Sequence, residues 1–289
     1  MKDINELIEL IELKELSPNI YVGQNYQAPW NRVFGGQVLS QAVSAAYKTV
    51  PKDRFAHSMH AYFLLAGDIS IPIHYEVESV RDGGSFSTRR VVAKQNDVPI
   101  FITSISFQSK QDGFDHQIDM PNVVGPEGLK SDEDLVNKYK LFVPQNILQS
   151  IKTRPFEFRP VEKLSVFDRI TKPPYKHIWF KAKEKVEGGL DVHQQLLTYV
   201  SDYNLLTTAT LPHTKGPIPK DLFMASLDHA MWFHRDFRID EWMLYALDSP
   251  SASNTRGFTR GNIFTQKGKL VASVVQEGLI RKAKKGTLK

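Results

Sequence analysis

The sequence predicts an α+β protein built twice from one unit, an apolar helix followed by an antiparallel sheet. Three observations predict this: a helix of buried type stands before a run of alternating strands, that order recurs in the second half, and matching residues of the two halves keep a constant spacing. With 289 residues, 41% of them hydrophobic and 24% charged, the chain is long enough for two such units.

The first half begins with an acidic amphipathic helix at 1–14. A second helix starts at Phe34-Gly35-Gly36-Gln37 and carries small and aliphatic residues at helical spacing through Ala46. Four strands are predicted after it, at 57–65, 71–81, 85–95 and 98–108, with turn-forming residues between them. The first half is therefore a helix followed by an antiparallel meander.

A polar stretch rich in Gly and Pro separates the halves, with a charged helical segment at 131–140. We therefore divide the chain into an N-terminal domain at 1–115, a linker at 116–150 and a C-terminal domain at 151–289. In the C-terminal domain we predict strands at 156–160 and 178–185, a helix at 191–206, and strands at 226–233, 242–249, 256–266 and 269–281.

The two halves align residue by residue. Tyr62 and Arg90 correspond to Trp232 and Arg260, each 170 positions later. The helices align at a smaller offset of 158, so the second half needs extra loop residues, which 213–220 can supply. A long helix wrapped by an antiparallel sheet, duplicated so that the sheets join edge to edge, buries both helices and covers free strand edges. This arrangement is the double hot dog.

Composition excludes several functional classes. The chain has no cysteine, so we exclude a disulfide framework, a thiolate metal site and a cysteine nucleophile. The net charge of +5 is mostly dispersed, and the one dense basic run, at 281–285, is typical of a solvated tail, so we expect no nucleic-acid partner. No run approaches the roughly 20 apolar residues of a membrane helix, so we expect no membrane partner.

Other signals are also set aside. The nine histidines suggest metal, but His57 with His60, and His229 with His234, point to opposite faces of a regular strand, so we expect no metal site. There is no G-x-S-x-G elbow, dinucleotide fingerprint or P-loop. Because the N-terminus is not signal-like and the C-terminal residues 287–289 are not a peroxisomal signal, we expect a cytoplasmic protein.

Six segments together resemble the acyl-CoA thioesterase II family, and the resemblance extends over nearly the whole chain. They are VFGGQ at 33–37, HSMHAYF at 57–63, VRDGGSF at 80–86, VSDYN at 200–204, LDHAMWFH at 227–234 and VQEG at 275–278. Because they occur in the family's order and at its spacing, the match is specific.

The resemblance implies hydrolysis of medium- to long-chain fatty acyl-CoA to free fatty acid and CoA, without a cofactor. The family's catalytic Asp, hydroxyl residue and Gln match Asp202, Ser226 and Gln276. The family often has Thr in place of Ser226. We expect activity to survive at a reduced level, because Ser lacks the methyl group that stiffens the side chain.

The residues themselves suit this chemistry. Thioester hydrolysis needs a positioned water, a base to take its proton, and donors for the developing oxyanion. Asp202 flanks the apolar stripe of its helix, where partial burial would raise its pKa and make it a better base. Gln276 shares a strand face with apolar residues, and its amide can both donate and accept. Ser226 precedes a strand and can add a third hydrogen bond.

The repeat provides an internal control. By the two offsets, Asp202 corresponds to Ser44, Ser226 to Ala56 and Gln276 to Ser106, so the first half lacks all three groups. We therefore predict that only the second half is catalytic and that water attacks directly, without a covalent acyl-enzyme.

Five further residues are candidates for substrate or oxyanion contacts. Gly35 and Gly36 open a helix whose N–H groups favour an anion, although they can equally serve only to turn the chain. His57 lies in the first-half counterpart of the site, where it either contacts substrate or is simply packed. Arg256 and Arg260 can meet CoA phosphates or be solvated strand-edge charges.

Two other functions remain open from the sequence. One is a hot-dog enoyl-CoA hydratase, for which only His57 and His229 could act on the acyl chain. The other is a hot dog that binds acyl-CoA without turnover, against which the three-residue constellation argues. For each of these functions we expect a homodimer or homotetramer, because a double hot dog leaves a broad sheet surface and the family that the chain resembles often forms such assemblies.

Overall fold

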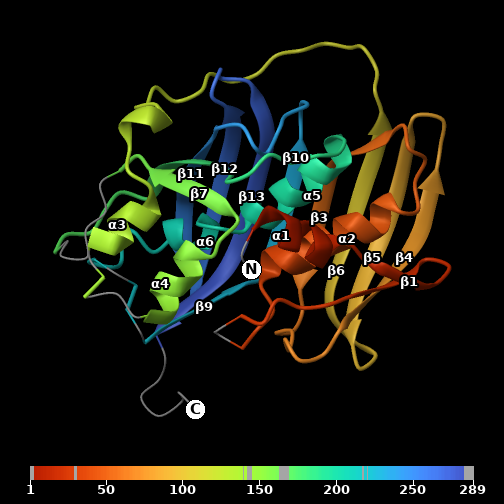
Figure 1. The fold of residues 1–289 in the computed structure, drawn as a ribbon, viewed down its shortest axis with the longest axis horizontal. Coiled ribbons are helices and arrows are strands. Elements are labelled where there is room, and N and C mark those ends of the chain that lie inside the picture. Colours follow the sequence, from red (N-terminus) through yellow and green to blue (C-terminus); the bar gives the residue numbers. More distant parts are fainter. Residues whose placement is uncertain are drawn as a thin grey trace.

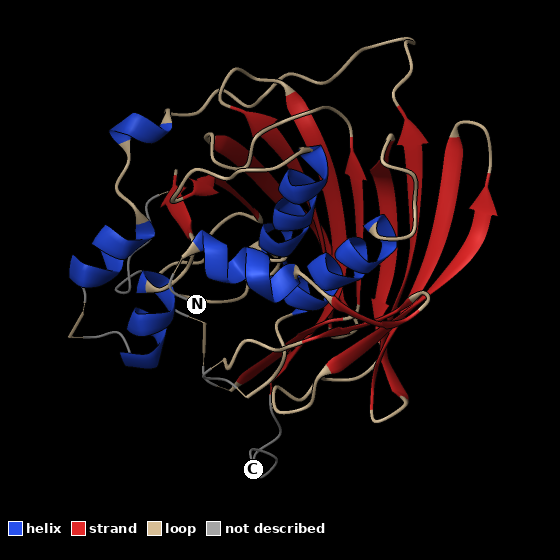
Figure 2. Cartoon of the chain, turned by 45° about the vertical axis from the view of Figure 1, so that its right-hand side comes forward, coloured by secondary structure: helices blue, strands red, loops and turns tan. Residues whose placement is uncertain are grey.

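The computed structural model describes residues 3–28, 31–138, 140–141, 145–162, 169–216, 218–219 and 221–282. Its strands form one curved antiparallel sheet, and helices α1, α2 and α5 lie together against the inner side of that sheet (Figures 1 and 2). The α+β architecture agrees with the prediction.

The first half contains the predicted helices and all four predicted strands, with ends shifted by a few residues. Its elements are α1 (Ile4–Ile11), β1 (Lys14–Ser17), β2 (Ile20–Gly23), α2 (Gly35–Tyr47), β3 (Arg54–Phe63), β4 (Ile73–Asp82), β5 (Phe86–Gln95) and β6 (Val98–Ser109). The hairpin β1–β2 was not predicted. All four residues of β1 are exposed, so this strand carries no alternating hydrophobic signal.

The connection and second half contain η1 (Pro126–Gly128), α3 (Asp132–Lys138), α4 (Gln145–Lys152), β7 (Phe156–Pro160), β8 (Tyr175–Ala182), α5 (Leu190–Ser201), α6 (Leu205–Thr208), β9 (Leu222–Ser226), β10 (Asp228–Phe233), β11 (Met243–Ser253), β12 (Arg256–Thr265) and β13 (Leu270–Lys282). Two predictions differ from the structure here, and two elements, α4 and β9, were not predicted. The helix predicted at 191–206 is two helices, and strand β8 begins and ends three residues earlier than predicted.

Corresponding strands of the two halves occupy equivalent positions in the sheet, counted inward from opposite edges. The order is β1-β2-β4-β5-β6-β3-β10-β13-β12-β11-β8-β7, with β9 paired to β13 in addition. The halves meet where β3 pairs with β10, with His60 opposite Ala230. These two residues are 170 positions apart, so the pairing agrees with the offset found in the sequence.

The main core lies between the helices and the inner face of the sheet. Leu39 and Val43 of α2, Leu197 of α5 and Met59 of β3 are all fully buried. Each such side chain contributes about 1.5–3 kcal/mol relative to an exposed one. The two long helices also contact each other, since the Ser40 hydroxyl donates to the carbonyl of Gln195 (2.7 Å).

A second, smaller core lies on the outer face of the second-half sheet. Trp179 points to this face, because its strand neighbours on either side belong to the main core. Met120 and Val123 pack over it, and the Trp179 indole N–H donates to the carbonyl of Val124 (2.8 Å). The segment predicted as a linker therefore covers the sheet. The predicted boundary at residue 150 falls inside α4.

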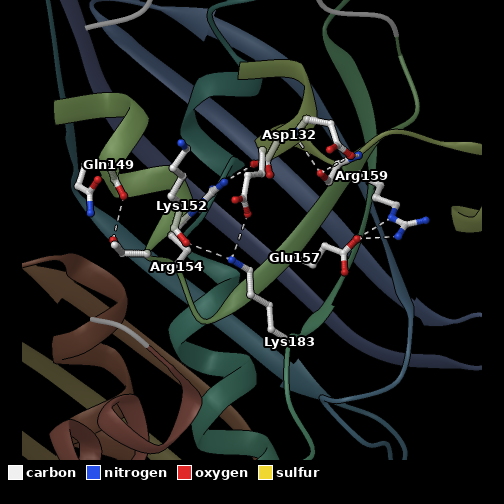
Figure 3. Close-up of polar contacts among 11 residues, drawn as sticks. Asp132, Gln149, Lys152, Arg154, Glu157, Arg159 and Lys183 are labelled. Carbon is white, nitrogen blue, oxygen red and sulfur yellow. Dashed lines mark hydrogen bonds and ion pairs between the residues drawn. The ribbon is translucent and has the colours of Figure 1, made fainter. Parts of the chain in front are cut away.

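Helices α3 and α4 are attached to the second half by ion pairs and hydrogen bonds (Figure 3). Arg154, just after α4, pairs with Asp132 at the start of α3. Lys183 contacts the carbonyl of Lys152 (3.2 Å). The Arg154 guanidinium also lies over the ring of Tyr203, 5.8 Å from its centroid. These helices therefore reach the chain segment that directly follows Asp202.

No helix in the described part of the chain is both long and apolar enough to cross a bilayer.

Candidate active site

Asp202 is the C-cap residue of α5 and is partly buried. Two residues later, Asn204 has a φ of 68°, in the left-handed region that Asn tolerates better than most residues. This turn separates α5 from α6, which explains why the predicted single helix is broken. The carboxylate consequently lies at a helix end, close to the sheet and to α2.

Gln276 joins the other two predicted residues through its amide nitrogen. Nε2 donates to Asp202 Oδ1 (2.8 Å) and to Ser226 Oγ (3.0 Å). Gln276 is fully buried on β13, and its Oε1 has no hydrogen-bond partner in the described structure. The two amide hydrogens are therefore both used, while a buried acceptor remains available beside the carboxylate.

The first half contributes one donor to this site. The Gly36 N–H, at the start of α2, donates to Asp202 Oδ2 (3.0 Å). A side chain at Gly36 would lie 2.3 Å from the carbonyl oxygen of Tyr199, and one at Gly35 would lie 2.7 Å from Asp202 Oδ2. Glycine is required at both positions by this close approach. The Gly36 N–H, predicted as an oxyanion donor, here holds the carboxylate.

The environment of Asp202 suits a general base. Burial raises the pKa of this carboxyl, and the hydrogen bonds from Gln276 and Gly36 oppose that rise. Each carboxylate oxygen accepts one of these bonds and keeps a further lone pair. The group is held in one orientation and can still accept a proton.

The remaining predicted contacts lie elsewhere. His57 bonds to Ser106 Oγ (2.8 Å), and burial lowers the pKa of its imidazole. Arg256 pairs with Glu277 (2.9 Å), and Arg260 pairs with Asp248 (2.6 Å). None of these three residues contacts Asp202, Ser226 or Gln276 directly in the described structure.

The strand pairing corrects the first-half counterpart of Gln276. In the first half, His60 of β3 pairs with Ser104 of β6. In the second half, Ala230 of β10 pairs with Val275 of β13. Ala230 comes 170 positions after His60, but Val275 comes 171 positions after Ser104. The offset between β6 and β13 is therefore 171, and Gln276 corresponds to Ile105, not Ser106. Both Ile105 and Gln276 are fully buried, as counterparts on one face should be.

The counterpart of Asp202 changes as well. Aligning α2 and α5 on their N-cap residues, Phe34 and Gly189, pairs Asp202 with Tyr47 and not with Ser44. The Tyr47 hydroxyl accepts from the N–H of Ala56 (2.9 Å), the counterpart of Ser226. The first half therefore has a phenol, a methyl group and an aliphatic side chain where the second half has its three polar groups.

A buried network supports the end of α5, and the sequence did not assign it this role. His229 Nε2 lies 3.0 Å from Ser201 Oγ, next to Asp202, and burial lowers the pKa of His229 to about 3. The Tyr245 hydroxyl donates to the carbonyl of Ser201 (2.9 Å). His229 belongs to the motif at 227–234, but only the fold shows that it reaches Ser201.

An aromatic cavity of about 140 Å³ lies beside the site. It is lined by Tyr199 and Tyr203 of the Asp202 segment, together with Phe34, Tyr26 and Arg154. In the described part of the chain, no three His, Asp or Glu residues are grouped as metal ligands.

Two family models match the chain. Residues 147–279 match the one described as Acyl-CoA thioesterase, and residues 26–108 match Acyl-CoA thioesterase N-terminal domain. The chain is 40% identical over 283 residues to acyl-CoA thioesterase 2 from Haemophilus influenzae, a match that covers 97% of this chain and 99% of that protein. The chain belongs to the acyl-CoA thioesterase family. The resemblance identified in the sequence is thereby confirmed.

Two solved structures are similar to this chain, one at an identity that supports the family and one at an identity that supports the fold alone. Acyl-CoA thioesterase II TesB2 from Mycobacterium marinum matches with a TM-score of 0.79 and 37% identity, over 96% of this chain and 98% of that one. A protein from Alicyclobacillus acidocaldarius described as having a hot dog fold matches with a TM-score of 0.75 at 16% identity, over 96% of this chain and 99% of that one. The predicted double hot-dog fold is confirmed.

Proposed function

We propose that this protein hydrolyses medium- to long-chain fatty acyl-CoA to free fatty acid and CoA, with water as the nucleophile and Asp202 as the base. The observation that carries the proposal is the Gln276 amide, which joins Asp202 and Ser226 through two hydrogen bonds. Membership of the acyl-CoA thioesterase family supports the substrate class.

Asp202 accepts a proton from a water as the water oxygen attacks the thioester carbonyl carbon. Gln276 Oε1, which is buried and has no partner among the described residues, accepts a hydrogen bond from the same water. Ser226 Oγ accepts from Gln276, so its own hydrogen is available to the developing oxyanion. When the tetrahedral intermediate collapses, the C–S bond breaks and the proton held by Asp202 passes to the leaving CoA sulfur. The products are a fatty acid and free CoA thiol.

The geometry does not favour the hydratase alternative. His229 is fully buried and bonds to Ser201, while His57 bonds to Ser106 in the other half. Neither histidine contacts the three polar groups of the site.

The test is thiol release from acyl-CoAs of C4 to C18 by wild type and by Asp202→Asn. The chain has no cysteine, so the protein adds no thiol background. We expect release that is greatest for medium to long chains and is reduced about 100- to 10,000-fold in the variant, the range for loss of a general base. Asp248→Asn, a matched change at an exposed carboxylate, should leave the rate unchanged.

Three results would contradict the proposal. Full activity in Asp202→Asn would show that Asp202 is not the base. A stable acyl adduct on Ser226, detected by intact-protein mass spectrometry, would show a covalent route and not direct attack by water. Binding of acyl-CoA by wild type without thiol release would favour the binding-protein alternative.

We further propose three finer properties. The chain is divided into units at 1–115, 116–150 and 151–289, assembles as a homodimer or homotetramer, and resides in the cytoplasm. Limited proteolysis, light scattering coupled to size-exclusion chromatography, and cell fractionation test these in turn.

A further inference from the structure

A basic cavity of about 430 Å³ lies where β9 begins at Leu222 and β13 ends at Lys282. We call it the basic pocket. The pocket has four cationic side chains and one carboxylate, Asp221; the cations are Lys215, Arg256, Arg281 and Lys282. Its volume lies within the range of small-molecule sites, about 300–1,000 Å³.

Most of this positive charge has no counter-ion. Arg256 pairs with Glu277 (2.9 Å), but Lys215, Arg281 and Lys282 form no ion pair with any described residue. Like charges that share a cavity repel one another, and an anion in the cavity would relieve that repulsion. The basic pocket is therefore suited to a ligand with several negative charges.

The basic pocket is connected to the active site by one strand. On β9, Leu222 lines the pocket and Ser226 belongs to the site, and these residues pair with Lys282 and Gly278 of β13. Four residues of strand span about 13 Å. The pantetheine arm of CoA is longer than this when extended, so one CoA molecule can reach both places.

A second guanidinium without an ion pair among the described residues lies beside β9, the strand that connects the pocket to the site. The ring of Phe223, on β9, has Arg281 at 5.9 Å and Arg32 at 5.7 Å from its centroid. Arg32 comes from the first half, three residues before Gly35, and forms no ion pair in the described structure. Two guanidinium groups therefore lie over one ring of β9, the strand that connects the pocket to Ser226.

We propose that the basic pocket binds the phosphorylated nucleotide end of CoA, with Arg281 and Lys282 contacting its phosphates while the pantetheine arm follows β9 to Ser226. This inference rests on the proposed thioesterase function. It replaces Arg260 as a phosphate ligand, because Arg260 lies outside the pocket and is held by Asp248 (2.6 Å).

The test compares two substrates, an acyl-CoA and the matching acyl-pantetheine, which has the thioester but lacks the nucleotide. The variant is Arg281→Ala combined with Lys282→Ala, and the control is Arg260→Ala, an exposed Arg that a carboxylate already holds. We expect the double variant to raise KM for acyl-CoA at least about tenfold, the value of one charge-assisted contact, with kcat little changed. KM for acyl-pantetheine should stay within about twofold of wild type.

A second measurement identifies the ligand end that binds. Adenosine 3′,5′-bisphosphate, which reproduces part of the nucleotide, should compete with acyl-CoA in wild type and inhibit the double variant at least about tenfold more weakly. Non-competitive inhibition would indicate a separate nucleotide effector site and would overturn the proposal.

Other outcomes also overturn it. The proposal is wrong if KM rises equally for both substrates, or if the double variant behaves like Arg260→Ala. Calorimetric titration of CoA into wild type and into the double variant compares their affinities for CoA directly, and it tests the proposal without turnover. If no protein hydrolyses either substrate while CoA affinity still falls in the double variant, the proposed function fails and the CoA site stands.

Discussion

The two halves of this protein have the same strand order and a similar helix, yet only one has the groups that hydrolysis requires. In the second half, the Gln276 amide joins Asp202 to Ser226. In the first half, Ile105 and Ala56 occupy the positions of Gln276 and Ser226. The fold is thus maintained by apolar residues common to both halves, and the proposed activity depends on three polar substitutions in one of them.

Among variants that exchange Gln276 or Ser226 for the matching first-half residue, the largest effect should come from Gln276→Ile. Gln276→Ile removes both hydrogen bonds that orient Asp202 and Ser226, so we expect kcat for acyl-CoA to fall about 100- to 1,000-fold. Thiol release at saturating substrate measures it, with Ile105→Val as the control at the matching position. A variant that keeps half of the wild-type kcat would show that the amide is not needed.

A smaller loss is expected from the second exchange between the halves. Ser226→Ala reproduces Ala56 and leaves the contact between Asp202 and Gln276 intact, so the catalytic loss comes from the one hydrogen bond that the hydroxyl would donate to the developing oxyanion. One such bond is about 1.5 kcal/mol, so kcat should fall about tenfold. The same thiol assay measures it, and a loss as large as that of Gln276→Ile would mean that Ser226 has a greater role, such as nucleophile.

The halves should also differ in how pH affects their stability. His229 is buried and neutral, with its pKa lowered from 6.5 to about 3, whereas its counterpart 170 positions earlier, Met59, cannot titrate. Unfolding lets His229 bind a proton below pH 6.5, so its contribution to stability is complete above that pH and is lost as the pH falls.

The variant His229→Met removes this titration. We expect the urea-unfolding free energy of wild type to fall below pH 6.5 more steeply than that of the variant, by up to about 1.4 kcal/mol per pH unit. Parallel pH profiles for the two proteins would mean that His229 is protonated in the folded state.

The smallest effect concerns the hydroxyl residue itself. Ser226→Thr keeps the hydroxyl and restricts its rotation, so we expect kcat to rise by no more than about threefold. The thiol assay measures it, and a large loss would indicate that the site cannot accommodate the added methyl group.

The sequence alone predicted the repeated helix and most strands, because both leave periodic hydrophobic patterns. It could not predict β1, whose four residues are all exposed, or the break in the second-half helix, which depends on the left-handed backbone of Asn204. It also paired Gln276 with Ser106. The offset between β6 and β13 differs by one residue from that of the neighbouring strands, and only the hydrogen-bonded register shows this. An error of one residue in a strand assigns a side chain to the wrong face of the sheet.

For the site, the sequence named Asp202, Ser226 and Gln276, and the fold brings them into hydrogen-bond contact. Gly36 was also named, but as an oxyanion donor. That it holds Asp202 from the other half follows only from the crossing of α2 past the end of α5, where Gly36 approaches the carbonyl of Tyr199. Long-range contacts of this kind leave no local pattern in a chain.

The hydrogen bond from Gly36 to Asp202 affects how the sequence of such a protein can evolve. In a symmetric pair of separate chains, each site would take its carboxylate from one chain and its glycine N–H from the other, and any substitution would appear in both sites at once. Joining the two copies in one chain removes that constraint. One copy can then lose its polar groups and keep only the glycine-bearing helix, which still completes the site of its neighbour.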